Sequence, residues 1–226
     1  QADATTVSGT GITVTVNTAG TAAADGGGAV VSNITDAGAL SITTKNGTND
    51  STGNITRTAT STLSGASLSL STGVGSIGTG TGTAAINVAA GQTGVSLLTH
   101  TATGNIFLTA PGALTLPAIT TTGGGVNVAT TAAGTLTAGG LISTGGGAVT
   151  LSSQDALAVN GGITAVGGAV NLLANQDGAG AEGFSQADAT TISGTGITVT
   201  VNTGAGTGTG AAVVSNITDA GALAIK

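Results

Sequence analysis

Residues 186–226 repeat residues 1–42 of this 226-residue chain almost letter for letter. The first copy begins QADATTVSGTGITVTVNT and the second begins QADATTISGTGITVTVNT, with Val7 replaced by Ile. A further match, AVVSNITDAGAL, starts at Ala29 and again at Ala212, so the offset between the copies is slightly shorter there. Repetition at such a spacing is typical of tandem arrays. We therefore predict a piece of a longer protein, with one long unit over residues 1–185 and the start of the next over 186–226.

The composition excludes several common kinds of chain. Glycine supplies 42 residues, charged residues make up 5%, and there are two Phe but no Cys, Met, Trp or Tyr. A core must then be built from Val, Ile, Leu and Ala, which suits a thin, regularly stacked interior. The low charge argues against disorder, the glycines lack the three-residue period of collagen, and no apolar run is long enough to span a membrane.

Short runs with apolar residues two positions apart recur along the chain, which is the period of strands with one buried face. Between positions 86 and 172 these runs fall into columns that share one nearly constant spacing. The first column holds the inward pairs Ile86/Val88, Ile106/Leu108, Val126/Val128, Val149/Leu151 and Val170/Leu172. The second column holds Leu114, Leu136 and Leu157, and the third holds Ile119, Leu141 and Ile163.

Three columns with one period predict three short faces per coil. We therefore expect an all-β, elongated fold, a parallel β-helix (β-solenoid) with coils of about 20–23 residues. Glycine triplets and pairs at 123–125, 145–147 and 167–168 would form one corner of successive coils. At about 4.8 Å per coil, a unit would hold roughly nine coils and advance about 43 Å. The polar stretch Lys45–Thr58 is interpreted as a loop excursion from the stack or as an irregular coil.

The rhythm GGGAVTL, DALAV, GGI over residues 145–163 resembles the repeat regions of large bacterial surface exoproteins. These are the filamentous-haemagglutinin-like adhesins and related giant β-strand-repeat proteins. The resemblance covers most of residues 84–175 as a coil pattern, and the rest more loosely. It implies a right-handed, elongated molecule that is secreted or held at the surface of a Gram-negative cell.

The residues give little support for catalysis. His100 is the only histidine, there is no cysteine nucleophile, and no serine lies in a nucleophile-elbow motif, so we expect no catalytic residues and no cofactor. Asp155 and Asp177 are separated by close to one coil and are weak candidates for a Ca²⁺ site. The alternative for this pair is two Asx-type turns at one corner. Asp36 and Asp219 occupy the same NITDAG turn in the two copies.

The residue between the two members of each inward pair should point outward. These residues are Asn87, Phe107, Asn127, Thr150 and Asn171. Phe107 stands out, because an outward aromatic ring could make a lateral contact with a neighbouring filament. Packing under the Pro111–Pro117 segment is the alternative.

These observations predict a non-enzymatic structural protein, an extracellular fibre or adhesin stalk built from tandem units. Its partners would be itself, through adjacent repeats or neighbouring filaments, and a host or cell-surface ligand. A net charge of −6 with only Lys45, Arg57 and Lys226 as cations argues against nucleic acid and anionic membranes.

Three other functions stay open. The first is a self-assembling filament of separate chains stacked end to end. An ice-binding face would need Thr-x-Thr on consecutive coils, for which Thr13/Thr15 and Thr198/Thr200 qualify locally. A polysaccharide-acting β-helix would need a cluster of carboxylates with a base.

Overall fold

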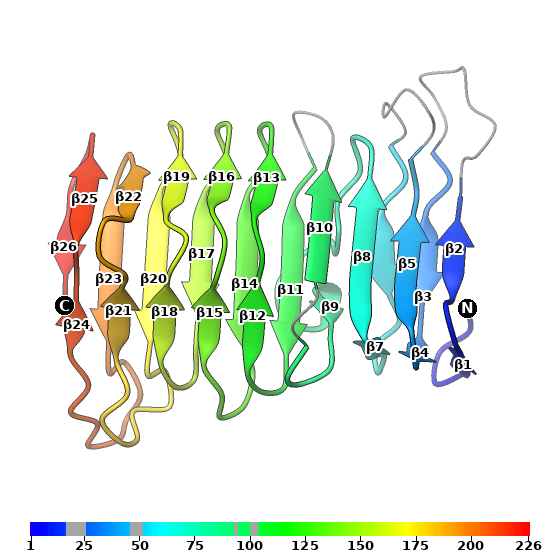
Figure 1. Cartoon of the computed structure of the whole chain (residues 1–226), viewed down its shortest axis with the longest axis horizontal. Coiled ribbons are helices and arrows are strands. Elements are labelled where there is room, and N and C mark those ends of the chain that lie inside the picture. The colour runs from blue at the N-terminus through cyan, green and yellow to red at the C-terminus, as the bar shows by residue number, and fades with distance from the viewer. Residues whose placement is uncertain (17–25, 46–51, 93–94, 100–103) are drawn as a thin grey trace.

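The chain folds as a parallel β-solenoid whose coils stack along the long axis of the molecule (Figure 1). The computed structural model describes residues 1–16, 26–45, 52–92, 95–99 and 104–226. Every strand pair among these residues is parallel, and strands inside each sheet pair with strands of the coils before and after them. Because side chains alternate along a strand, each coil sends one apolar set inward to a common core. The all-β solenoid expected from the sequence is confirmed.

Each coil visits three faces in a fixed order, named here face 1, face 2 and face 3. Face 3 carries a nine-stranded sheet with one strand per coil. Its strands are β2 (Thr13–Thr15), β5 (Ala39–Thr43), β8 (Ser67–Thr72), β10 (Val95–Thr99), β13 (Ile119–Thr121), β16 (Ile142–Thr144), β19 (Ile163–Ala165), β22 (Thr191–Gly194) and β25 (Asn216–Asp219).

Face 1 carries a two-stranded and a seven-stranded sheet, which the bridges from Ile77 to Ile55 and to Ile106 connect. The smaller sheet contains β3 (Ala29–Val31) and β6 (Ile55–Arg57). The larger contains β9 (Ile86–Asn87), β11 (Ile106–Ala110), β14 (Val126–Thr130), β17 (Val149–Ser152), β20 (Val170–Ala174), β23 (Ile197–Val201) and β26 (Ala224–Ile225).

Face 2 carries a three-stranded and a five-stranded sheet. The first contains β1 (Thr6–Gly9), β4 (Asn33–Asp36) and β7 (Leu63–Ser64). The second contains β12 (Leu114–Leu116), β15 (Leu136–Ala138), β18 (Leu157–Val159), β21 (Phe184–Gln186) and β24 (Ala212–Val213). Residues 88–91 lie between the two sheets, since Val88 bridges Leu63 and the Gly91 amide donates to the Ala113 carbonyl (2.8 Å). The described residues also hold the 3-10 turn η1 (Gly82–Ala84) and no helix with the length and hydropathy of a membrane span.

The core is a set of aliphatic columns that run along the axis. On face 1, Ile106, Val126, Val149 and Val170 pair in the predicted register and are buried, and Ile197 extends the column. On face 2, the column of Leu114, Leu136 and Leu157 continues into the buried ring of Phe184.

Two predicted register positions are wrong. The third column runs through Ile142, which is 0% exposed, whereas Leu141 points outward and is 47% exposed. The two residues are adjacent and both apolar, so alternation alone could not decide which faces inward. Ile86 pairs with Leu108 rather than Ile106, because Ile77 takes the place beside Ile106.

Coil length varies more than the sequence columns suggested. Between Ile106 and Val170 the paired residues are 20, 23 and 21 positions apart, but 27 or 28 separate Leu40 from Leu68, Leu68 from Val95, and Val170 from Ile197. The predicted excursion Lys45–Thr58 is corrected at its end, where β6 joins the stack with Ile55 buried. Residues 46–51 lie outside the described ranges.

Buried threonine hydroxyls close the corner between face 3 and face 1. The Thr72 hydroxyl donates to the Gly75 carbonyl (2.5 Å), and the hydroxyls of Thr121 and Thr144 donate to the carbonyls of Gly124 and Gly147. Each bond satisfies a hydroxyl that the chain takes away from water, so a polar side chain is tolerated at the edge of the core.

The two sequence copies form the same coil-to-coil interface. In the first copy, Val7 pairs with Ile34 and Val14 with Ile42; in the second, Ile192 pairs with Ile217 and Val199 with Ile225, which are the same positions. Gln1 bridges to Ser32 and Asn33 with its side-chain amide, and Gln186 makes the same bonds to Ser215 and Asn216.

These matched interfaces lie on different faces of the solenoid. Strands β3, β4 and β5 lie on faces 1, 2 and 3, while their counterparts β24, β25 and β26 lie on faces 2, 3 and 1. Since β5 and β25 are the second and ninth strands of the nine-stranded sheet, seven coils separate them, and β26 lies one face further on. The repeated sequence thus recurs after seven and one-third coils, fewer than the roughly nine expected for a unit, because the long coils use more residues.

Candidate functional site

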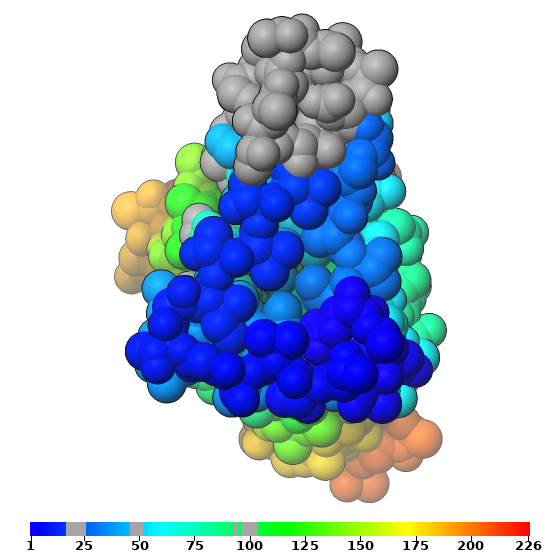
Figure 2. Space-filling model, turned by 90° about the vertical axis from the view of Figure 1, so that its right-hand side faces the viewer, coloured from blue at the N-terminus to red at the C-terminus, as the bar shows by residue number. Residues whose placement is uncertain are grey.

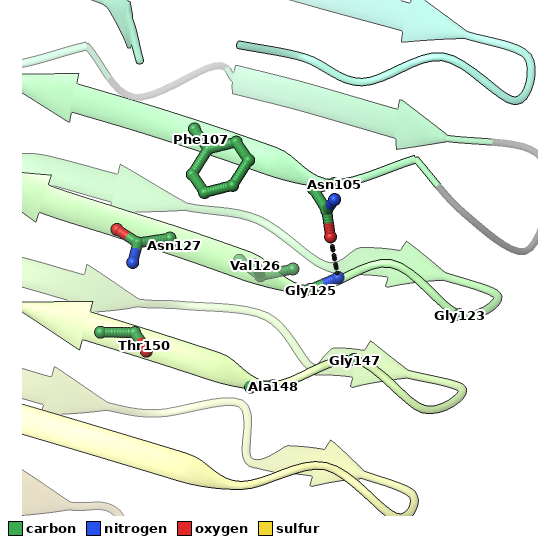
Figure 3. A pocket seen from close by; sticks show the side chains of 9 residues that line it. All are labelled: Asn105, Phe107, Gly123, Gly125, Val126, Asn127, Gly147, Ala148 and Thr150. Atoms are coloured by element: carbon green, nitrogen blue, oxygen red, sulfur yellow. Dashed lines mark hydrogen bonds between the residues drawn. The ribbon is translucent and has the colours of Figure 1, made fainter. Parts of the chain in front are cut away.

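The outward side chains of face 1 border a shallow hollow of about 270 Å³. Phe107 on β11, Asn127 on β14 and Thr150 on β17 lie side by side in the strand register, and Figure 3 shows them on three successive coils. The Asn105 side-chain oxygen accepts a hydrogen bond from the Gly125 amide (2.7 Å), which fixes the rim beside the ring. Phe107 is half-buried and points outward, as predicted.

Glycine corners shape the edge of this hollow. A Cβ atom on Gly147 would lie 2.2 Å from the carbonyl carbon of Gly124, and one on Gly125 would lie 2.9 Å from the Ala148 carbonyl oxygen. Neither glycine has a positive φ, so close approach between coils is the reason for glycine at both positions. The coils can therefore stack closely enough for the outward side chains to form one continuous surface.

The hollow offers one aromatic ring, amide groups and a hydroxyl, and its lining residues carry no charge. None of these groups titrates near neutral pH, so the lining supplies neither a general acid nor a general base. The surface can contact the apolar part of a neutral partner. The residues that border it come from β11, β14, β17 and the glycine corners, so the hollow is not formed by the Pro111–Pro117 segment. A lateral contact through Phe107 stays a prediction.

Asp155 and Asp177 lie on stacked turns of neighbouring coils. The Asn175 amide donates to the Asp155 carbonyl (2.8 Å), and the Asp177 amide donates to the Gln154 carbonyl (3.4 Å). The Asp177 carboxylate accepts a bond from the Ala179 amide (3.0 Å), which is the Asx turn considered as the alternative to calcium. Within the described ranges, no three His, Cys, Asp or Glu side chains come close enough to share a metal ion.

Asp36 and Asp219 have a role that the sequence did not reveal. The Asp36 carboxylate accepts hydrogen bonds from the amides of Gly11 and Ile12 in the preceding coil and of Gly38 in its own turn. Asp219 accepts the corresponding bonds from Gly196, Ile197 and Gly221, at 2.7, 2.9 and 2.8 Å. Each carboxylate therefore ties two successive coils together. The repeated NITDAG motif was the available signal, but it indicated only a turn.

These bonds change the acidity of both carboxyl groups. For Asp36, burial raises the pKa, but the amides of Ile12, Gly38 and Gly11 together outweigh burial and hold the pKa below its usual value. For Asp219, the Gly221 amide makes the largest contribution, and the pKa is again lowered. Both aspartates are thus held as carboxylates that act on the backbone, not as proton donors.

The N-terminal end of the solenoid leaves part of the core uncovered. Figure 2 shows this end, where a hollow of about 320 Å³ opens between the first two coils. Its lining is mostly aliphatic and comprises Gln1, Val7, Ile12, Val14, Val16, Gly28, Ala29, Val30, Val31 and Ile34. An apolar surface of this kind normally marks a site of contact with another protein segment.

Two other sequence candidates receive a partial answer. His100 lies outside the described residues. Thr13 and Thr15 lie beside Ser41 and Thr43, whereas Thr198 lies between Asn171 and Ala224, so the second Thr-x-Thr pair is not continued on its neighbours.

No known protein family, curated protein or solved structure matches this chain.

Proposed function

We propose that this chain is part of a non-enzymatic structural fibre, the stalk of an adhesin that a bacterium carries outside the cell. Tandem units equivalent to residues 1–185 would build the fibre. The observation that carries the proposal is the matched interface at the two ends. The repeated sequence stacks its own coils in one register in both copies, as units of a continuous solenoid would.

Four further features support a mechanical role. On face 1 an aliphatic column runs in register from Ile106 to Ile197, and the carboxylates of Asp36 and Asp219 bind backbone amides. Outward side chains along the described coils are mostly Ser, Thr and Asn, which suit a hydrated fibre surface. With Lys45, Arg57 and Lys226 as the only cations, the chain offers few sites to trypsin-like proteases.

The source gene and the cell surface test this proposal. We expect the gene to encode several further copies of the QADATT unit, and gold-labelled antibodies against the purified chain to mark filaments on intact cells. A gene with one unit, or label found only after cells are opened, would contradict the proposal.

The apolar N-terminal hollow favours one second candidate, a filament of separate chains stacked end to end. Sedimentation velocity over a wide range of concentrations distinguishes the two. Growing polymers of the single chain would support the filament, and a monomer at every concentration would support the tandem fibre.

A further inference from the structure

The same residues are exposed in the first copy and covered in the second. Val7 on β1 is 44% exposed, whereas its counterpart Ile192 on β22 is 0% exposed. Ile12 and Val14 are half-buried, whereas Ile197 and Val199 are fully buried. The two copies differ here only in Val7→Ile, so the difference in exposure comes from what lies on them. The second copy therefore shows how the surface of β1 and β2 is covered when a neighbour is present.

The cover of the second copy is the coil Leu157–Ala174. Ile163 pairs with Ile192, Val170 with Ile197, and Leu172 with Val199. Backbone bonds complete the contact: the Ala187 amide donates to the Val159 carbonyl, and the Thr195 amide donates to the Gly168 carbonyl, both at 2.9 Å. The paired side chains that face the core are aliphatic, so burial drives the contact and the backbone bonds set its register.

Gly9 points to the same neighbour independently. At its counterpart Gly194, an added Cβ would lie 2.9 Å from a methyl group of Val170 and 3.0 Å from the Gly168 carbonyl oxygen. At Gly9, an added Cβ would meet only the side chain of Ile12, at 3.3 Å. Neither glycine has a positive φ. Within this chain, the preceding coil requires glycine at position 194. At position 9 none of the described residues lies where Gly168 and Val170 lie at position 194, so no such contact requires glycine there.

We propose that β1 and β2 form a docking face for the coil Leu157–Ala174 of a second copy of the repeat unit. Ile163 of that copy lies over Val7, Val170 over Ile12, and Leu172 over Val14. This inference rests on the proposed fibre function and specifies the joint between its units. Within the single chain, the coil Leu157–Ala174 is already covered by residues 186–201. The occupant is therefore the same coil of a preceding unit, whose next residues are Gln1 onward.

Disulfide trapping tests the register, because the chain contains no cysteine of its own. The protein used is the full chain preceded by a second copy of residues 1–185, joined as Ser185 is joined to Gln186. Thr164→Cys in the first unit is combined with Ser8→Cys in the second. A disulfide requires Cα atoms within about 7 Å. The single chain provides the matched positive control, Thr164→Cys with Ser193→Cys, since these two residues pair in the structure.

We expect the joint pair to oxidise to the same extent as this control. Thr164→Cys combined with Thr13→Cys should give no disulfide, because the counterpart of Thr13 pairs with Asn171. Control oxidation without oxidation at the joint would overturn the inference, and so would equal oxidation of the Thr13 pair.

Gly9→Ala supplies a second test, and its first part uses the single chain without introduced cysteines. In the single chain, Gly9→Ala should leave the urea midpoint of unfolding unchanged, whereas Gly194→Ala should lower that midpoint. In the second unit of the two-unit protein, Gly9→Ala should strongly reduce oxidation at the joint. Unchanged oxidation would contradict the docking register. A source gene that encodes one unit would contradict the fibre proposal. If the gene encodes many units but the joint of the two-unit protein does not oxidise, only the present inference would be contradicted.

Discussion

At the scale of single residues, two aspartate side chains connect neighbouring coils by hydrogen bonds. Asp36 and Asp219 each accept three backbone amide bonds, two of them from the preceding coil. A carboxylate is the strongest neutral-pH acceptor available to a side chain, and its bonds to amides are shorter and stronger than those of an amide oxygen. The few charges in this chain are therefore structural at these two positions.

The lowered pKa values give stability a defined pH dependence. Because the folded pKa of Asp36 and Asp219 lies below the unfolded value of about 3.9, their stabilisation is fully present above that pH. It is lost as the pH falls through the folded value. We expect the urea midpoint to fall below about pH 4. In the double variant Asp36→Asn/Asp219→Asn, the urea midpoint should be lower than in the parent at pH 7 and should change less as the pH falls. If the urea midpoints of variant and parent depended on pH in the same way, this role of the two aspartates would be contradicted.

Adjacent Leu141 and Ile142 provide a residue-level test of register. Truncation of Ile142 to Ala removes buried methyl groups and should cost about 2–5 kcal/mol of unfolding free energy. Leu141→Ala removes an exposed side chain and should stay within about 0.5 kcal/mol of the parent. Chemical denaturation measures both. A larger loss for Leu141→Ala would restore the register first inferred from the sequence.

The same pair explains what the sequence could and could not reveal. Val126, Val149 and Val170 each stand between glycine or alanine and a polar residue, so only one of the two alternating sets of positions carries large apolar side chains, and their register is predictable. At Leu141–Ile142 both sets carry a large apolar side chain, and Ile77 lies in a glycine-rich tract with little alternation. The carboxylate bonds of Asp36 were unpredictable for another reason, because their partners in the preceding coil are far away in the sequence and carry no side-chain signal.

At the scale of elements, the glycine corners decide how closely coils stack. Gly146 and Gly147 are adjacent, but an added Cβ on Gly146 would come no closer than 4.0 Å to another atom, whereas one on Gly147 would overlap the Gly124 backbone. We expect Gly147→Ala to destabilise by about 2–4 kcal/mol. Gly146→Ala should be neutral or stabilise by up to about 1 kcal/mol, since it restricts the unfolded chain. Equal effects in thermal unfolding would show that the corner does not limit stacking.

At the scale of the whole molecule, protection should differ between the two sequence copies. Residues 6–16 lie at an open end, whereas their counterparts 191–201 are covered on both sides by other coils. We expect hydrogen exchange followed by mass spectrometry to show faster exchange in 6–16, because end coils open without breaking the rest. The near-identical sequences make intrinsic exchange rates almost equal. Equal protection would indicate that the N-terminal end is already capped.

In the proposed fibre, the extra third of a coil between equivalent residues would have a consequence for the whole assembly. Successive units would present the same residue one face further round, so equivalent sites wind about the axis as a screw with three units per turn. The full pattern would recur after 22 coils, or roughly 106 Å at 4.8 Å per coil. The Phe107 hollow would then occur on every side of the fibre in turn. The sites would therefore be distributed evenly around such a fibre. Whichever side lies against a surface, the same set of sites would face both that surface and the solution.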